Sequence, residues 1–247
     1  QGSPQENLEA LTKAIARIYA SGLSPDALLY RRANKLQDYD ERLAVLIQVV
    51  QGEQHGRYYF PDLAGVAFSR NLFRWSPQIR AEDGFLRLVW GLGTRAVDHV
   101  GDDYPRMVAL SQPELRAQGD LRSIRTYSQK IIDLIDLEDN SFRSAPIEEV
   151  LAGDYPHTRL LASLYKDGDL QTIRSKLAAR EGEMVLTLDG VLRQTPLAGR
   201  MRRALAHLEK HYRSPVDMEF TLEFQEGEGS QTDLRLYILQ CRPQSHL

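Results

Sequence analysis

Cysteine is almost absent from this chain of 247 residues, which contains only one. A single cysteine excludes an internal disulfide and any zinc site built from several cysteines, and it is consistent with a reducing compartment. Long apolar runs are absent too, since none approaches the ~20 residues of a membrane-spanning helix. The N-terminal residues do not form a secretory signal pattern. We therefore expect a cytoplasmic protein without a membrane partner.

Charge of one sign is also scarce, because 31 lysines and arginines oppose 34 aspartates and glutamates, for a net charge of −3. This balance argues against a general nucleic-acid surface. The six histidines do not stand at metal-ligand spacing, and the sequence holds no P-loop lysine and no H-E-x-x-H or G-x-S-x-G motif. These absences argue against metalloprotease, P-loop and serine-hydrolase chemistry.

The composition that remains, 42% hydrophobic and 26% charged residues, is that of an ordinary globular protein. A chain of this length can bury roughly 70–75% of its unfolded surface, as one large domain or as two lobes.

Two segments near the C-terminus predict a β-hairpin. Because side chains alternate between the faces of a strand, one face of the first segment is entirely apolar: Val216, Met218, Phe220, Leu222 and Phe224. The glycine-containing stretch that follows allows an antiparallel return. Asp217 and Glu219, on the other face, would then meet Gln240 and Arg242 near the end of the return strand.

This polar set suits a metal–polyphosphate site. Carboxylate and amide oxygens are ligands that Mg²⁺ favours, and an arginine fork can hold phosphate oxygens in a fixed plane. The alternative is a solvated hairpin face with a surface ion pair worth ~0–1 kcal/mol.

Residues 215–220 (PVDMEF) followed by residues 239–243 (LQCRP) resemble the closing motif P-x-D-x-E … L-Q-x-R-P of one family. It is the ATP-binding domain of phosphoenolpyruvate synthase and pyruvate phosphate dikinase. The resemblance implies that Glu219 and Gln240 bind Mg²⁺. It also implies that Arg242 is the catalytic residue that holds the ATP phosphates, with Asp217 in support.

Residues 43–50 (LAVLIQVV) form the most apolar run and predict a buried central strand. They are similar to the family's V-x-V-Q-x-M-V segment along the adenine pocket, which implies that Gln48, Val49 and Val50 line the base. Alternatively, Gln48 is a buried amide that finds a partner in a neighbouring strand or a bound water.

Helical spacing predicts an amphipathic helix from Pro4 to Ser21 with one buried face, and Ser24 is expected to cap a second helix through Arg32. Residues 197–212 predict a third helix, basic on its exposed side, and its end (LEKHY) is similar to the family's I-E-x-H-Y. His157–Leu164 and Gln171–Arg180 read as two more helices.

Leu63–Ser69 and Phe85–Trp90 predict core strands, and Gly65 inside the first indicates a close backbone approach or a bulge. Gly91–Thr94 resembles the family's G-L-G-E turn between a strand and a helix, except that threonine replaces the glutamate. Gly101–Arg106 (GDDYPR) reads as a solvated turn, with a cation site as the alternative.

The predicted fold is α+β, an ATP-grasp-like lobe with a mostly antiparallel central sheet, flanking helices and an inserted segment. We assign residues 1–247 to the second lobe of such a domain: a helical pair (5–35), a core sheet (43–105), a probable insertion (106–195), and a helix with the ligand hairpin (196–247). The family's first lobe, its carrier-histidine domain and its pyruvate-binding barrel have no counterpart in the sequence. We therefore expect a fragment that is inactive alone.

The resemblance implies a phosphotransferase that uses ATP and Mg²⁺ to phosphorylate a carrier histidine on another domain, and then pyruvate or a related acceptor. One alternative is a degenerate, non-catalytic module for nucleotide sensing or interaction. Another is a dikinase with a different acceptor, such as an antibiotic or a glucan. The phosphohistidine and pyruvate-binding domains of the parent chain are the expected partners.

Overall fold

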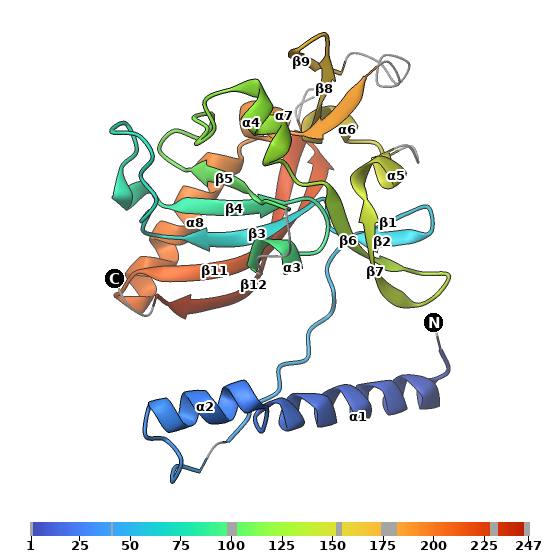
Figure 1. The fold of residues 1–247 in the computed structure, drawn as a ribbon, viewed down its shortest axis with the longest axis vertical. Coiled ribbons are helices and arrows are strands. Elements are labelled where there is room, and N and C mark those ends of the chain that lie inside the picture. The colour runs from blue at the N-terminus through green and yellow to red at the C-terminus, as the bar shows by residue number, and fades with distance from the viewer. Residues whose placement is uncertain are drawn as a thin grey trace. The chain divides into compact units, whose positions relative to one another are not determined.

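The computed structural model describes residues 2–40, 42–97, 103–151, 155–173, 182–227 and 232–244 (Figure 1). Internal contacts divide the chain into two units, residues 1–50 and 51–247. The predicted α+β class is confirmed, because helices accompany three sheets in which all paired strands are antiparallel. No helix in the described ranges is both long and apolar enough to cross a membrane.

The first unit contains the two predicted helices, α1 (Pro4–Ser21) and α2 (Pro25–Ala33). Ser24 caps α2 as expected, since its hydroxyl accepts a hydrogen bond from the Ala27 amide. The expected buried face of α1 is wrong, because no residue of either helix is buried. An amphipathic face needs a second layer to cover it, and the described part of this unit contains no further helix or strand.

The predicted buried strand at residues 43–50 is also wrong. This segment is extended but belongs to no sheet, and Leu46 and Val49 are 72% and 78% exposed. A strand forms only when its backbone groups meet a partner, and no strand occurs among the described residues of the first unit. Apolar β-branched composition alone therefore did not establish burial.

The second unit is built on a five-stranded sheet in the order β12-β11-β3-β4-β5. Its strands are β3 (Leu63–Phe68), β4 (Phe85–Val89), β5 (Arg106–Ala109), β11 (Val216–Glu226) and β12 (Thr232–Pro243). Helix α8 (Leu197–Tyr212) crosses one face (Figure 1), where Met201 and Leu205 join the same core cluster as Met218. We call this the core face of the sheet.

Two smaller sheets complete the second unit. One contains β1 (Glu53–His55), β2 (Tyr58–Phe60), β6 (Ile131–Asp136) and β7 (Ser141–Pro146), and the other contains β10 (Glu183–Leu186), β8 (Ala162–Lys166) and β9 (Asp169–Thr172). Short helices connect the strands: η1 (Ala81–Asp83), α3 (Thr94–Val97), α4 (Leu121–Thr126), α5 (Ile147–Leu151), α6 (Thr158–Leu161) and α7 (Asp189–Gln194).

Two of the expected helices between the smaller sheets are wrong in part. The helix expected over His157–Leu164 ends at Leu161, and β8 begins at the next residue. Gln171 and Thr172, expected to start a helix, belong to β9 instead, and residues 174–180 of that prediction lie outside the described ranges. A short stretch of mixed apolar and polar residues is compatible with both the helical and the strand periodicity. Here β8 pairs with β10 and β9, and this pairing makes the segment a strand.

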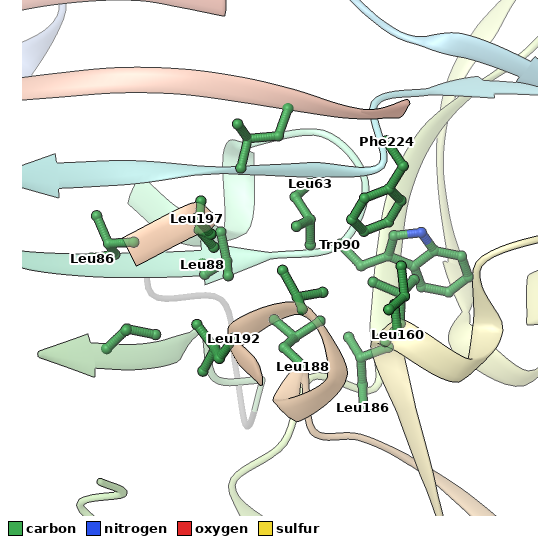
Figure 2. Packing of buried hydrophobic residues seen from close by; sticks show 14 of the residues in the cluster. Leu63, Leu86, Leu88, Trp90, Leu160, Leu186, Leu188, Leu192, Leu197 and Phe224 are labelled. Carbon is green, nitrogen blue, oxygen red and sulfur yellow. The ribbon is translucent and has the colours of Figure 1, made fainter. Parts of the chain in front are cut away.

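The apolar core joins the core face of the five-stranded sheet to residues of α6, α7 and α8. Figure 2 shows Leu63 and Trp90 of the sheet region in one cluster with Leu188, which precedes α7, and Leu192 of α7. Trp90 is completely buried, and its ring meets that of Tyr155 at a centroid distance of 5.2 Å. One continuous core therefore holds the sheet, including Met218 and Phe220 of the hairpin that carries the predicted ligand residues.

Asp62, just before β3, is a buried carboxylate with a pH-dependent role in stability. It accepts hydrogen bonds from the Tyr155 hydroxyl and, at 2.6 Å, from the Phe224 amide. Burial nevertheless raises the pKa of Asp62. The folded chain thus binds this proton more tightly than the unfolded chain. The Asp62 contribution to stability is therefore complete below the ordinary aspartate pKa of about 3.9, and it is lost as the pH rises through the raised value.

Asp62→Asn should remove this loss of stability with rising pH. The check is urea unfolding of both proteins at a series of pH values from about 3 upward. Glu226→Gln, which changes an exposed acid, should keep the wild-type dependence. Parallel pH profiles for wild type and Asp62→Asn would contradict the assignment.

Candidate functional site

The hairpin of β11 and β12 brings the four predicted ligand residues together. Its antiparallel register places Asp217 opposite Arg242 and Glu219 opposite Gln240. The alternation expected for β11 is confirmed at its start, since Met218 and Phe220 are buried in the core whereas Asp217 and Glu219 retain partial exposure. Further along the strand, Thr221 and Glu223 of the expected polar face are buried as well. The acids of the outgoing strand thus face the amide and the guanidinium of the returning strand.

A β-bulge at Leu239 makes this arrangement possible. Glu219 pairs with Gln240, but the next residue, Phe220, pairs with Ile238, so that Leu239 is an extra residue in β12. Simple alternation would put Gln240 on the same side as the buried Leu234. The bulge moves Gln240 to the opposite face, the one that carries Glu219. Bulges near functional sites commonly redirect a side chain in this way. The sequence analysis did not foresee this shift.

The partners of the four side chains divide them into two pairs. The Arg242 Nε donates a hydrogen bond of 2.8 Å to the Asp217 carboxylate, which is only 14% exposed, while Arg242 is 61% exposed. In the described part of the chain, the side chains of Glu219 and Gln240 make no hydrogen bond or ion pair. Their oxygens are therefore available to an external ligand, and a carboxylate with an amide oxygen fits the chemistry of Mg²⁺.

The same face of the sheet carries an arginine that the sequence analysis missed. Glu219 pairs with Val66 of β3, and Val66 pairs with Arg87 of β4, so all three side chains leave the same side of the sheet. The Arg87 guanidinium lies 5.7 Å from the ring centre of Phe68 and has no carboxylate partner among the described residues. We call this side the ligand face. In the sequence, the only sign of this residue is that Arg87 interrupts the apolar run FLRLV.

Cys241, beside the ligand residues, is not suited to nucleophilic chemistry. Burial, and secondarily the negative charge of Asp217, raise the pKa of its thiol. The reactive form of cysteine is the thiolate, which this environment disfavours. Cys241 also packs against the core cluster, so its place is that of a small apolar residue opposite Met218.

Comparison with known families agrees with this geometry. Residues 5–247 match the family described as "Pyruvate phosphate dikinase, AMP/ATP-binding domain". The chain belongs to this family. No individual protein of curated function matches the sequence.

The G-L-G-T turn shows how this member of the dikinase domain family accommodates its departure from G-L-G-E. The Thr94 hydroxyl donates a 2.6 Å hydrogen bond to Asp133 of β6. Asp133 also pairs with Arg95 and accepts a hydrogen bond from Ser144. A glutamate at position 94 would bring a second negative charge to Asp133. Thr94 therefore ties α3 to β6 and does not supply an acid.

The turn expected at Gly101–Arg106 is not a solvated one where the structure describes it. The Asp103 side chain is only 7% exposed, and it pairs with Arg95 at 3.0 Å. Arg106 is buried as well. Gly101 and Asp102 lie outside the described ranges. The charged residues of this stretch predict a solvent-exposed turn. An ion pair inside the fold instead allows the Asp103 side chain to be buried.

The three residues predicted to line the adenine belong to the first unit. Gln48, Val49 and Val50 lie in its extended C-terminal segment, whereas the ligand hairpin belongs to the second unit. Asp217, Glu219, Gln240 and Arg242 thus form the part of the predicted site that the structure brings together.

Proposed function

We propose that this dikinase-family domain supplies the Mg²⁺ and phosphate ligands of a phosphotransferase. That enzyme moves a phosphoryl group from ATP to a carrier histidine on another domain, and from there to pyruvate or a related acceptor. The observation that carries the proposal is the pair Glu219 and Gln240, opposite each other and without side-chain partners in the described chain.

Each ligand residue has a separate role in this proposal. Glu219 and Gln240 hold the metal, which when bound neutralises phosphate charge. Arg242 contacts the transferred phosphate, because its guanidinium is well exposed and can still present donors beyond the Nε that Asp217 engages. Asp217 orients that guanidinium. Phosphoryl transfer depends mainly on positioning and charge neutralisation, which these groups can provide.

Arg87 extends the same chemistry across the ligand face. Its positive charge lies on the side of the sheet that carries Glu219, two strands away. A polyphosphate held at the hairpin can reach toward β4, since neighbouring strands are only about 4.8 Å apart. Arg87 would then add a second cationic contact to that of Arg242.

The adenine contact falls to Gln48, Val49 and Val50 in this proposal, as the family resemblance implies. The exposure of Val49 leaves its surface available to a planar apolar partner. The remaining parts of the reaction, the carrier histidine and the acceptor site, would come from the phosphohistidine and pyruvate-binding domains of the parent protein.

The decisive test is labelling of the full-length parent protein with radioactive ATP in the presence of Mg²⁺. We expect protein-bound label that survives alkali and is lost in acid, as a phosphohistidine is. ATP binding without label would identify a nucleotide sensor instead. Label that passes to an acceptor other than pyruvate would retain the phosphotransferase and change its substrate.

The isolated 247-residue chain should bind ATP weakly or not at all. In this proposal another lobe contributes the remaining ATP contacts, and few residues alone rarely offset the entropic cost of association. Titration calorimetry of this chain with ATP, with and without Mg²⁺, provides the measurement. Tight, Mg²⁺-dependent binding would contradict the expectation.

A further inference from the structure

Arg106, the first residue of β5, is a buried cation on the side of the sheet opposite the ligand face. It pairs with Leu88 of β4, which pairs with Gly65 of β3, and Gly65 pairs with Phe220. All of these residues belong to the core face. Only 6% of the Arg106 side chain is exposed. It is therefore separate from the site proposed for ATP.

The guanidinium of Arg106 lacks the partners that burial demands. None of its three nitrogens has a hydrogen bond in the described structure. Among the described residues, its closest carboxylate oxygen comes from Asp189 and is 3.9 Å away. That oxygen lies 2.7 Å from the guanidinium of Arg116, which also donates to the Thr187 carbonyl. Asp189 is thus engaged mainly by Arg116.

Among the residues that the structure describes, the charges at this place do not balance. Arg106 and Arg116 carry two positive charges, and Asp189 carries one negative charge, which leaves one excess positive charge in the interior. Burial, together with repulsion from Arg116, lowers the pKa of Arg106 to about 9. Arginine still remains protonated near neutral pH, and an uncompensated buried charge is strongly unfavourable. A single negative charge would restore neutrality.

A small cavity adjoins these two arginines. Its volume is about 10 Å³, and its lining includes Arg106, Arg116, Gln118 and Tyr127. This volume is near the smallest that admits one water-sized species, roughly 10–15 Å³. A tetrahedral phosphate or an organic anion is too large for it, whereas a monatomic anion is close to the right size.

We propose that a chloride-sized monoanion binds between Arg106 and Arg116, and that it stabilises the attachment of β5 to α7. The unpartnered guanidinium and its excess positive charge indicate an anion, and the small cavity limits its size. Because Asp189 begins α7 and Arg106 begins β5, the anion would hold together two elements distant in the sequence. The proposal does not depend on the nucleotide function.

Thermal unfolding in potassium chloride and in potassium gluconate at equal ionic strength tests the proposal, since gluconate is too large for the cavity. With chloride at ten times its dissociation constant, Tm should rise by about 3–6 °C relative to gluconate. Arg106→Met should unfold at the same temperature in both salts, because it removes the excess charge. Arg125→Met, which changes an exposed arginine paired with Glu183, should keep the difference.

Bromide provides a direct second measurement on the wild-type chain, and it decides the proposal even if Arg106→Met does not fold. Crystals grown with bromide should show an anomalous scattering peak beside the Arg106 guanidinium. Equal Tm values in the two salts, a chloride effect that persists in Arg106→Met, or bromide peaks confined to the surface would each overturn the proposal.

Discussion

Replacing Glu219 by glutamine should reduce ATP-dependent phosphorylation of the parent protein by roughly 10²–10³-fold, the usual effect of removing one preorganised electrostatic contact from an active site. Glutamine keeps the size of the side chain and one oxygen, but it removes the negative charge that opposes Gln240 in the hairpin register. Because Glu219 has no side-chain partner in the described structure, its removal breaks no structural contact. The initial rate of protein labelling from radioactive ATP measures the effect.

Arg242 offers a companion test at the same corner. Arg242→Ala should reduce labelling as well, and Arg242→Lys should stay impaired, because a lysine ammonium cannot reproduce the planar fork of a guanidinium. The exposed Glu226, on the same strand as Glu219, provides the matched control, and Glu226→Gln should leave the rate unchanged. Full labelling by Glu219→Gln and Arg242→Ala, with unaltered Tm, would refute the assignment of these residues.

Gly65→Ala should be the most destabilising small substitution in the five-stranded sheet, with a loss of about 3 kcal/mol in the free energy of unfolding. A methyl group at this position would overlap the backbone carbonyl oxygen of Arg87 and approach the Phe220 ring to 3.0 Å. Since the carbonyl belongs to the neighbouring strand β4, relief would require the two strands to separate. Overpacking typically costs about 1–3 kcal/mol, and the upper end applies here because a backbone carbonyl cannot move aside as a side chain can.

Urea unfolding measures this loss, and Gly119→Ala provides a control. No atom lies within 4 Å of a methyl group placed at Gly119, and its backbone is not in the left-handed region. This variant should therefore unfold close to the wild-type midpoint. A Gly65→Ala protein as stable as wild type would show that β3 and β4 adjust freely at this point.

The sequence predicted correctly those features that depend only on residues close together in the chain. Ser24 caps α2 through its own hydroxyl, and the alternating residues of β11 identify the face that Met218 and Phe220 bury. Gly65 was recognised as a place of close approach, which the Arg87 carbonyl explains. In each case the signal lies within a few residues of the feature that it predicts.

Features that depend on distant partners were predicted less well. Leu46 and Val49 have the composition of a buried strand but remain exposed, because composition does not supply a pairing partner. The charged sequence around Asp103 predicts a solvated turn, but the ion pair with Arg95 allows the Asp103 side chain to be buried. Arg87 was overlooked because its importance depends on the strands that flank it.

The amino-acid sequence by itself determined the family, the cap of α2 and the four polar residues of the hairpin, because each of these is carried by side chains at short and regular spacing. Only the tertiary structure decided which way those side chains face. The bulge at Leu239 turns Gln240 and Arg242 toward Glu219 and Asp217, while Leu234 stays in the core. The register of a long hairpin is set by how its apolar residues pack against a distant sheet and helix, and one extra residue exchanges the two faces.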